Sequence, residues 1–187
     1  MDRTLLIVDD EDGVRRALTR ALRGDGYRML TASSGEEGLK LLETEPVQLV
    51  LSDHRMGALS GIQFLRQVRE RWPDTLRILL TGYADLQMAI DAINQGELYR
   101  FLTKPWEDMD LRQSIRLGFE RLELARENQV LRAAVASQEH HLRKLELQFP
   151  GIAAVQRDSG GAVVMDEGED DLSRLSSDLA GMLSAMR

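Results

Sequence analysis

The chain has 187 residues, of which 43% are hydrophobic and 29% charged, and its formal net charge is −7. This length allows one full domain with a sizeable core and a smaller additional segment, and the acidic balance is wrong for a protein whose main surface binds nucleic acid. Cysteine is absent, which excludes disulfides, zinc-thiolate sites and a cysteine nucleophile. No apolar stretch approaches the roughly 20 residues of a membrane helix, so we expect a cytoplasmic protein without a membrane partner.

Short apolar runs alternate with amphipathic stretches in the first two-thirds of the chain. The expected strands are residues 4–8, 28–32, 49–52, 76–81 and 100–103. Between them, apolar residues recur at helical spacing, and Ser34 followed by Glu37 has the spacing of a capping box at a helix start. Strands that alternate with helices form a parallel sheet covered on both faces. The sequence therefore predicts an α/β fold with a doubly wound, five-stranded parallel sheet.

A much longer helix is expected after the last strand. The pattern from Trp106 to Gln148 has no proline, contains Gly118 as its only weak position, and stops at the F-P-G of residues 149–151. Residues 150–187 then suggest a short hairpin followed by an acidic, amphipathic helical tail. We expect three parts: residues 1–122 as the α/β domain, 123–149 as an extended helix continuous with it, and 150–187 as the tail.

Polar side chains gather where the predicted strands end. They are Asp9 and Asp10 after the first strand, Asp53 after the third, Thr81 and Gly82 after the fourth, and Lys104 after the fifth. In doubly wound sheets, ligands bind outside the carboxyl ends of the strands. Three carboxylates without histidine or thiol describe a hard-cation site, for which Mg²⁺ is the best candidate, and the lysine and hydroxyl suit a phosphoryl group beside that metal.

Each of these signals also has a plain structural explanation. Acids after a strand often cap the next helix, and a strand-terminal Lys-Pro is often only a turn, here with a candidate cis bond before Pro105. His54 is better explained as a packed or solvent-facing residue than as a general base. The functional interpretation depends on several signals falling at the same end of successive strands.

Four motifs together resemble the receiver domain of two-component response regulators, over about residues 4–122. They are I-V-D-D-E at 7–11, L-S-D-H-R-M at 51–56, L-T-G-Y-A at 80–84 and F-L-T-K-P-W at 101–106. The resemblance implies a flavodoxin-like fold in which Asp53 accepts a phosphoryl group from a sensor histidine kinase. It also implies that Asp10 and Asp53 bind Mg²⁺ directly, with Asp9 acting mainly through water and the Arg55 backbone carbonyl as a further ligand.

The resemblance assigns further roles and has clear departures. It implies that Lys104 and Thr81 hold phosphoryl oxygens beside Gly82, and that Thr81 and Phe101 move together as a switch. Phe101 lacks the hydroxyl of a tyrosine, and Gly57 stands where the family often has proline. Arg55 and Tyr83 occupy positions that tune the lifetime of the phosphoryl group in this family.

A heptad seam along the long helix predicts a homodimer. Leu124, Leu131, Gln138 and Leu145 fall at d, Asn128, Val135, Leu142 and Phe149 fall at a, and Leu117 continues the d series upstream. The single asparagine at an a position, Asn128, favours a parallel, two-stranded coiled coil and sets its register. The alternative is a helix packed along its own domain.

The function expected from these features is a dimeric response regulator that signals to an unknown downstream protein through its coiled coil or tail. It would be no enzyme beyond accepting and slowly losing its own phosphoryl group. One alternative is a phosphatase with Asp53 as nucleophile, but such enzymes place a second acid two residues later, where this chain has Arg55. Another is a receiver fragment of a longer regulator with a missing output domain. Direct nucleic-acid binding is not expected, because the residues before the seam are sparsely basic.

Overall fold

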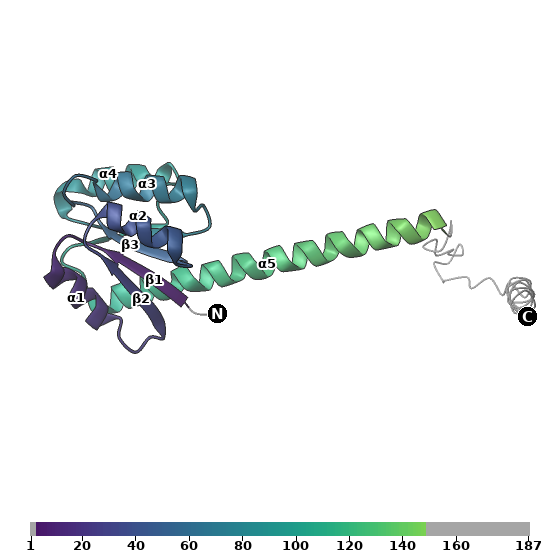
Figure 1. Ribbon diagram of the computed structural model, residues 1–187, viewed down its shortest axis with the longest axis horizontal. Coiled ribbons are helices and arrows are strands. Elements are labelled where there is room, and N and C mark those ends of the chain that lie inside the picture. Colours follow the sequence, from purple (N-terminus) through teal and green to yellow (C-terminus); the bar gives the residue numbers. More distant parts are fainter. Residues whose placement is uncertain (1–2, 149–187) are drawn as a thin grey trace, which may run out of the picture. The chain divides into compact units, whose positions relative to one another are not determined.

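The computed structural model describes residues 3–148, apart from the side chain of Glu146, and its core is a five-stranded parallel sheet (Figure 1). The strands are β1 (Arg3–Val8), β2 (Tyr27–Ala32), β3 (Leu49–Asp53), β4 (Leu76–Thr81) and β5 (Arg100–Thr103). They are ordered β2-β1-β3-β4-β5, and all neighbouring pairs are parallel. The expected doubly wound α/β fold is confirmed.

Helices cover both faces of the sheet. They are α1 (Asp12–Ala21), α2 (Gly35–Thr44), α3 (Gly61–Arg71), the short 3₁₀ helix η1 (Tyr83–Asp85), α4 (Leu86–Asn94) and α5 (Asp108–Gln148). In Figure 1, α2, α3 and α4 lie on one side of the strands, and α1 and the first part of α5 lie on the other. No helix within residues 3–148 is both long enough and apolar enough to cross a membrane.

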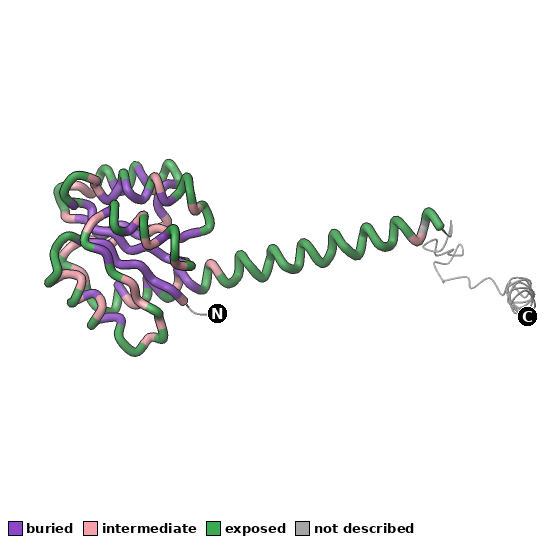
Figure 2. The backbone as a smooth tube through the Cα atoms, in the orientation of Figure 1, coloured by how far each residue is buried: buried purple, intermediate pink, exposed green. Residues whose placement is uncertain are grey.

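The period-two alternation along β1 divides its apolar residues between two cores. Leu6 and Val8 of β1 belong to the core beneath α2, α3 and α4, whereas Leu5 and Ile7 belong to the core beneath α1 and α5. All four side chains are fully buried. Figure 2 shows the same result as a sheet that is buried along most of its length. A strand buried on both faces explains why this segment is continuously apolar rather than alternating.

The capping boxes at the starts of α2 and α3 differ from what the sequence predicts. The Ser34 hydroxyl accepts a hydrogen bond from the backbone N–H of Glu37, as expected, but the Glu37 carboxylate accepts from Ser33 instead of from the Ser34 backbone. The capping box at α2 is therefore incomplete. A complete one begins α3, where the side chains of Ser60 and Gln63 each accept a hydrogen bond from the other's backbone N–H. Glutamine can fill the second position of a capping box as glutamate does, so the Ser60–Gln63 spacing is a sequence signal for this helix start.

Gly118 was expected to be a weak point in the long helix, and the structure shows why it is there. A Cβ atom on Gly118 would lie 2.7 Å from Leu49 Cδ1 and 2.9 Å from Leu76 Cδ2. The missing side chain therefore lets α5 approach β3 and β4 closely.

Helix α5 begins at Asp108, two residues later than expected, and its described part ends at Gln148. The contacts of the chain divide it into two units at Leu131 and Arg132, within this helix. Residues 123–144 of the helix are all exposed. Among the proposed seam residues, Leu124, Leu131, Val135 and Leu142 are large apolar side chains on the surface, and Leu145 is half-buried. Phe149 and the tail expected at 150–187 lie outside the described residues.

Candidate functional site

The carboxyl ends of four neighbouring strands bring the predicted polar residues to one edge of the sheet. Asp9 follows β1, Asp53 is the last residue of β3, Thr81 is the last residue of β4, and Lys104 follows β5. The backbone N–H of Lys104 donates to the Thr81 carbonyl over 2.7 Å, which ties the end of β5 to the end of β4. The Lys104–Pro105 bond is cis, as the sequence suggested.

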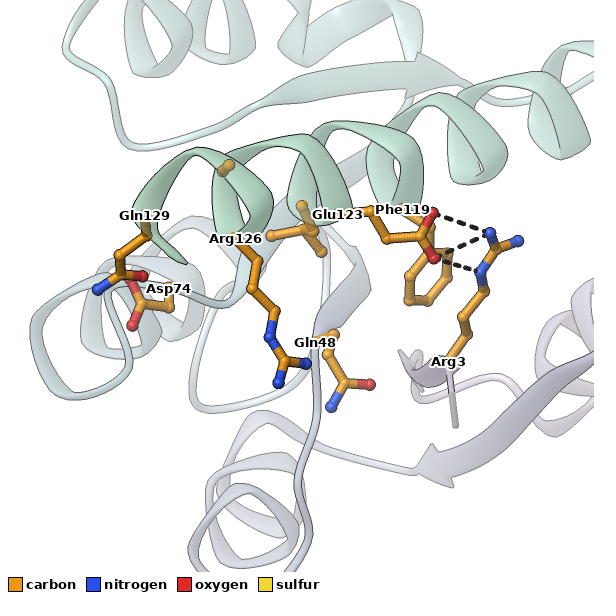
Figure 3. A pocket seen from close by; sticks show the side chains of 9 residues that line it. Arg3, Gln48, Asp74, Phe119, Glu123, Arg126 and Gln129 are labelled. Atoms are coloured by element: carbon orange, nitrogen blue, oxygen red, sulfur yellow. Dashed lines mark hydrogen bonds and ion pairs between the residues drawn. The ribbon is translucent and has the colours of Figure 1, made fainter. Parts of the chain in front are cut away.

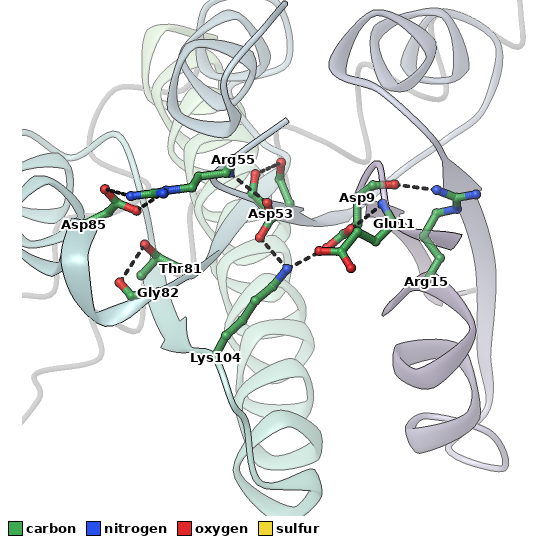
Figure 4. A network of polar contacts seen from close by, with 10 residues as sticks. Asp9, Glu11, Arg15, Asp53, Arg55, Thr81, Gly82, Asp85 and Lys104 are labelled. Atoms are coloured by element: carbon green, nitrogen blue, oxygen red, sulfur yellow. Dashed lines mark hydrogen bonds and ion pairs between the residues drawn. The ribbon is translucent and has the colours of Figure 1, made fainter. Parts of the chain in front are cut away.

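Lys104 joins the two buried carboxylates of this edge (Figure 4). Its ammonium nitrogen lies 2.7 Å from Asp53 Oδ1 and 3.0 Å from Asp9 Oδ2. The side chains of Asp9 and Asp53 retain only 1% and 7% of their accessible surface. Two like charges about 4 Å apart near a protein surface repel by roughly 4 kcal/mol. In this structure the Lys104 cation offsets that repulsion.

The second oxygen of each carboxylate is held by the chain that follows it. The backbone N–H of Glu11 donates to Asp9 Oδ1 over 2.8 Å, and the N–H of Arg55 donates to Asp53 Oδ2 over 2.7 Å. In both cases the donor is two residues further on, which is the geometry of an Asx-turn. Each carboxylate is thus fixed in orientation by one lysine contact and one local backbone contact.

Burial and hydrogen bonding act in opposite directions on the charges of this cluster. Burial raises the pKa of Asp9, although the Lys104 hydrogen bond and the Glu11 N–H partly counteract it. Burial alone would lower the pKa of Lys104, but its hydrogen bonds to Asp53 and Asp9 outweigh that effect and raise the pKa. Lys104 therefore remains a cation at neutral pH.

The other predicted residues are placed nearby but are not all joined to the cluster. Asp10 is exposed, so the buried partner of Asp53 is Asp9. Thr81 is fully buried at the end of β4, and its hydroxyl donates weakly to the carbonyl of Gly82, over 3.4 Å. Phe101 is half-buried and packs against the core beneath α2, α3 and α4.

The oxygen ligands at this edge suit Mg²⁺ in their chemistry. Carboxylates and backbone carbonyls are the ligands that this cation takes in proteins, usually with several waters. Among residues 3–148, however, no three acidic or histidine side chains are grouped as a ready cation cage. Lys104 takes the position between Asp9 and Asp53, so a bound cation would share these two carboxylates with it.

His54 follows Asp53 in the chain, but its surroundings indicate a structural role. It is 8% exposed, its backbone N–H donates to the Leu80 carbonyl over 2.9 Å, and its Nδ1 has no hydrogen-bond partner among the described residues. These contacts agree with packing, which was one of the two structural explanations left open by the sequence.

Two further features of the site were not recognised in the sequence. Gly61, the first residue of α3, lies against the backbone of Asp53, and its own N–H donates to the His54 carbonyl over 2.9 Å. Asp85, after the L-T-G-Y-A motif, forms an ion pair with Arg55. A glycine that opens a helix is a weak signal for close backbone approach, and no sequence signal links Arg55 to Asp85.

A recess elsewhere on the first unit does not belong to this site (Figure 3). It lies at the opposite ends of the strands, beneath α5, where Arg3 begins β1 and Gln48 precedes β3. The Arg3 guanidinium donates to both carboxylate oxygens of Glu123, over 3.0 and 3.1 Å. This recess is therefore separate from the carboxylate cluster.

Comparison with known proteins agrees with this geometry. Residues 5–116 match the family described as the response regulator receiver domain. The chain is 41% identical over 117 residues to the hydrogenase transcriptional regulatory protein HoxA of Cupriavidus necator, covering 63% of this chain and 24% of that protein. It is 37% identical to the transcriptional regulatory protein GlrR of Escherichia coli, covering 76% of this chain and 32% of that protein. The chain thus spans a third or less of the length of these relatives.

A solved structure shows the same fold. The crystal structure of a response regulator receiver domain protein from Clostridium thermocellum superposes with a TM-score of 0.61 at 35% identity. The match covers 65% of this chain and 98% of that one.

Proposed function

Because the chain belongs to the response regulator receiver domain family, we propose that Asp53 accepts a phosphoryl group from a sensor histidine kinase in a Mg²⁺-dependent reaction. The observation that carries this proposal is the contact of Lys104 with both Asp53 and Asp9 at the carboxyl ends of the strands. Phosphoryl transfer depends mainly on positioning and on neutralising charge, and this arrangement supplies both.

In the proposed step, a carboxylate oxygen of Asp53 attacks the phosphorus of a phosphohistidine. The new O–P bond forms as the P–N bond breaks, and the P–N electron pair stays on the histidine, whose other ring nitrogen is protonated, so the imidazole leaves as the neutral base. The Arg55 N–H already orients one oxygen of Asp53. The Lys104 ammonium nitrogen lies 2.7 Å from the other carboxylate oxygen, Asp53 Oδ1. After the transfer, Lys104 and the Thr81 hydroxyl would both donate hydrogen bonds to the phosphoryl oxygens.

Asp9, Asp10, Asp53 and the backbone carbonyl of Arg55 would hold the Mg²⁺ ion. When bound, the cation neutralises the charge that accumulates on the transferring phosphoryl group. Asp9 is buried beside Asp53, and Asp10 is exposed at the rim of the same edge, so the two acids differ in how they meet the ion. In this proposal Asp10 and Asp53 bind the ion directly, and Asp9 acts mainly through water.

We also propose that residues 1–122 form the signalling receiver, 123–149 a dimerising coiled coil, and 150–187 a tail that joins the coiled coil in contacting a downstream protein. The support lies in the exposed apolar side chains at heptad spacing on α5, including Leu124, Leu131 and Val135. Phosphorylation would change this contact through Thr81 and Phe101. HoxA and GlrR are transcriptional regulators by name, and an output of that kind would require chain beyond the matched region.

Incubation with a small phosphodonor and Mg²⁺ tests the phosphoacceptor. We expect one base-labile phosphoryl group per chain, no label on Asp53→Asn, and a wild-type label on Asp74→Asn, which removes an exposed carboxylate elsewhere. Undiminished labelling of Asp53→Asn would refute the assignment. A phosphatase would instead turn over an unrelated phosphomonoester many times, which the Arg55 position does not favour because it carries no general acid.

A further inference from the structure

Arg55 and Asp85 form a two-point ion pair above the end of β4 (Figure 4). Arg55 Nε lies 2.8 Å from Asp85 Oδ2, and Nη2 lies 3.1 Å from Oδ1. The Arg55 side chain is 72% exposed, whereas that of Asp85 is only 15% exposed. A planar guanidinium facing both oxygens of a carboxylate is geometrically specific, and a lysine could not reproduce it.

The Asp85 carboxylate does not cap the helix that it precedes. It is the N-cap residue of α4, and aspartate at that position normally accepts a hydrogen bond from an N–H in the first turn of the helix. Here the Asp85 side chain makes no such bond. The first turn of α4 therefore has no side-chain cap from Asp85 in this structure.

Arg55 also touches the phosphoacceptor, through its backbone. Its N–H donates to Asp53 Oδ2, while its side chain reaches away from Asp53 to Asp85 (Figure 4). The Arg55 residue therefore contacts both carboxylates, Asp53 through its backbone and Asp85 through its side chain.

We propose that Asp85 is a positioning residue that holds the Arg55 guanidinium away from Asp53, and that a phosphoryl group on Asp53 competes with Asp85 for it. This inference rests on the proposed function. It adds the phosphoryl group as a second partner of the Arg55 guanidinium, and it predicts that α4 gains a cap when Asp53 is phosphorylated. When Arg55 turns to the phosphoryl group, the Asp85 carboxylate becomes free to cap α4. In this structure the Asp85 carboxylate forms the ion pair and makes no cap bond.

The competition has a physical basis in charge and geometry. A phosphoryl group brings about −1.5 to −2 charges at neutral pH and oxygens that a guanidinium binds in the same two-point manner as a carboxylate. The Arg55 side chain is largely exposed to solvent, which screens its attraction to Asp85, so a more highly charged anion nearby can compete for it. Arg55 would then cover the phosphoryl group and slow attack by water.

The test compares how long the phosphoryl group survives on four forms of the full chain: wild type, Asp85→Asn, Arg55→Ala and the double variant. After labelling with a small phosphodonor and Mg²⁺ and removal of the donor, the loss of label is followed. We expect Asp85→Asn to lengthen the half-life by about two- to fivefold, the range available to a surface pair. In the Arg55→Ala background the same substitution should have no effect, and Asp85→Glu should restore the wild-type half-life.

Asp91→Asn is the matched control, because it removes an exposed carboxylate from the same helix, away from Arg55. It should keep the wild-type half-life. A second readout is amide hydrogen exchange at Gln87 and Met88, the positions whose N–H groups an Asp85 cap would bind. Phosphorylation should slow exchange there in the wild type and leave it unchanged in Asp85→Ala.

The outcomes separate this inference from the proposed function. A wild type that takes no label on Asp53 would refute the proposed function and this inference with it. A labelled wild type whose half-life is unchanged by Asp85→Asn, or an equal lengthening in the Arg55→Ala background, would refute the inference alone. The latter result would mean that Asp85 only supports the loop.

Discussion

A Cβ atom on Gly61 would lie 1.9 Å from the carbonyl oxygen of Asp53, so the first residue of α3 is in direct backbone contact with the end of β3. The same glycine donates its N–H to the carbonyl of His54. The loop that leaves Asp53 therefore returns to it at the start of α3, and only a residue without a side chain fits at the point of return.

Gly61→Ala should disturb the site because the added methyl group meets backbone rather than a side chain that can move aside. We expect a loss of about 1–3 kcal/mol in the free energy of unfolding, as for other overpacked positions, and slower labelling of Asp53. Urea unfolding and phosphodonor labelling measure the two effects. Gly57→Ala is the control, since nothing lies within 4 Å of its added Cβ. Equal behaviour of the two variants would contradict the close contact.

The sheet could be predicted because its signals are local. Every observed strand begins and ends within one residue of the expected range, since apolar runs such as residues 76–81 are buried on both faces and bounded by polar residues. Placing Asp9, Asp53 and Lys104 together needed only the rule that parallel strands end at one edge. Their distances confirm that the three side chains meet.

The remaining features depend on contacts that a sequence pattern does not contain. Asp9 and Asp10 are adjacent, and only the turn after β1 determines that Asp9 is buried and Asp10 exposed. The Arg55–Asp85 pair joins two loops far apart in the chain, and either residue alone is an ordinary surface charge. Gly118 looked like a defect in a helix because the side chains of Leu49 and Leu76 that exclude a Cβ lie on other elements.

Asp9 should make the stability of the protein depend on pH in metal-free buffer. Folding raises the pKa of Asp9 above 3.8, chiefly by burial, so the protonated carboxyl is favoured in the folded state. Its contribution to stability is fully present below the unfolded pKa and is lost as the pH rises through the folded pKa. Asp9→Asn does not titrate, so the stability of this variant relative to the wild type should increase as the pH rises from about 3.8.

Urea unfolding at several pH values with a chelator present measures this difference. Adding Mg²⁺ at neutral pH should favour the wild type again, because the cation would offset the carboxylate charge of Asp9, which the Asp9→Asn variant lacks. A relative stability that is constant or falls with rising pH would show that the Asp9 charge is fully compensated in the folded protein.

Gly118→Ala should fail to stabilise the protein although it removes a glycine from a helix interior. Alanine gains up to about 1 kcal/mol over glycine in helix propensity, but the new Cβ would meet Leu49 and Leu76 at less than 3 Å, an overpacking worth about 1–3 kcal/mol. Gly13→Ala, at the second residue of α1, has open space and should stabilise by less than the roughly 1 kcal/mol of a helix interior. Thermal unfolding measures the stability of both variants. If Gly118→Ala is stabilised as much as Gly13→Ala, then α5 has room for a side chain above the sheet.

The proposed dimer depends on Asn128 and Leu131 at neighbouring a and d positions of the seam. Within one chain the Asn128 amide donates to the Leu124 carbonyl over 2.9 Å, so its side chain is held on its own helix. In a parallel, in-register pair the two Asn128 side chains meet, whereas any slip places an amide against an apolar neighbour, at a cost of about 1–3 kcal/mol. Asn128→Ile should therefore tighten association but admit other oligomers.

Leu131→Asp should weaken the same dimer, because it places like charges opposite each other in the seam. Its matched control is Val130→Asp: the two wild-type side chains are similarly exposed, at 64% and 61%, but Val130 occupies the outward c position. Light scattering at micromolar concentrations should find a dimer for the wild type and Val130→Asp and a shift toward monomer for Leu131→Asp. A monomeric wild type, or equal association of the two aspartate variants, would mean that the apolar residues of this helix do not form a seam between two copies of the chain.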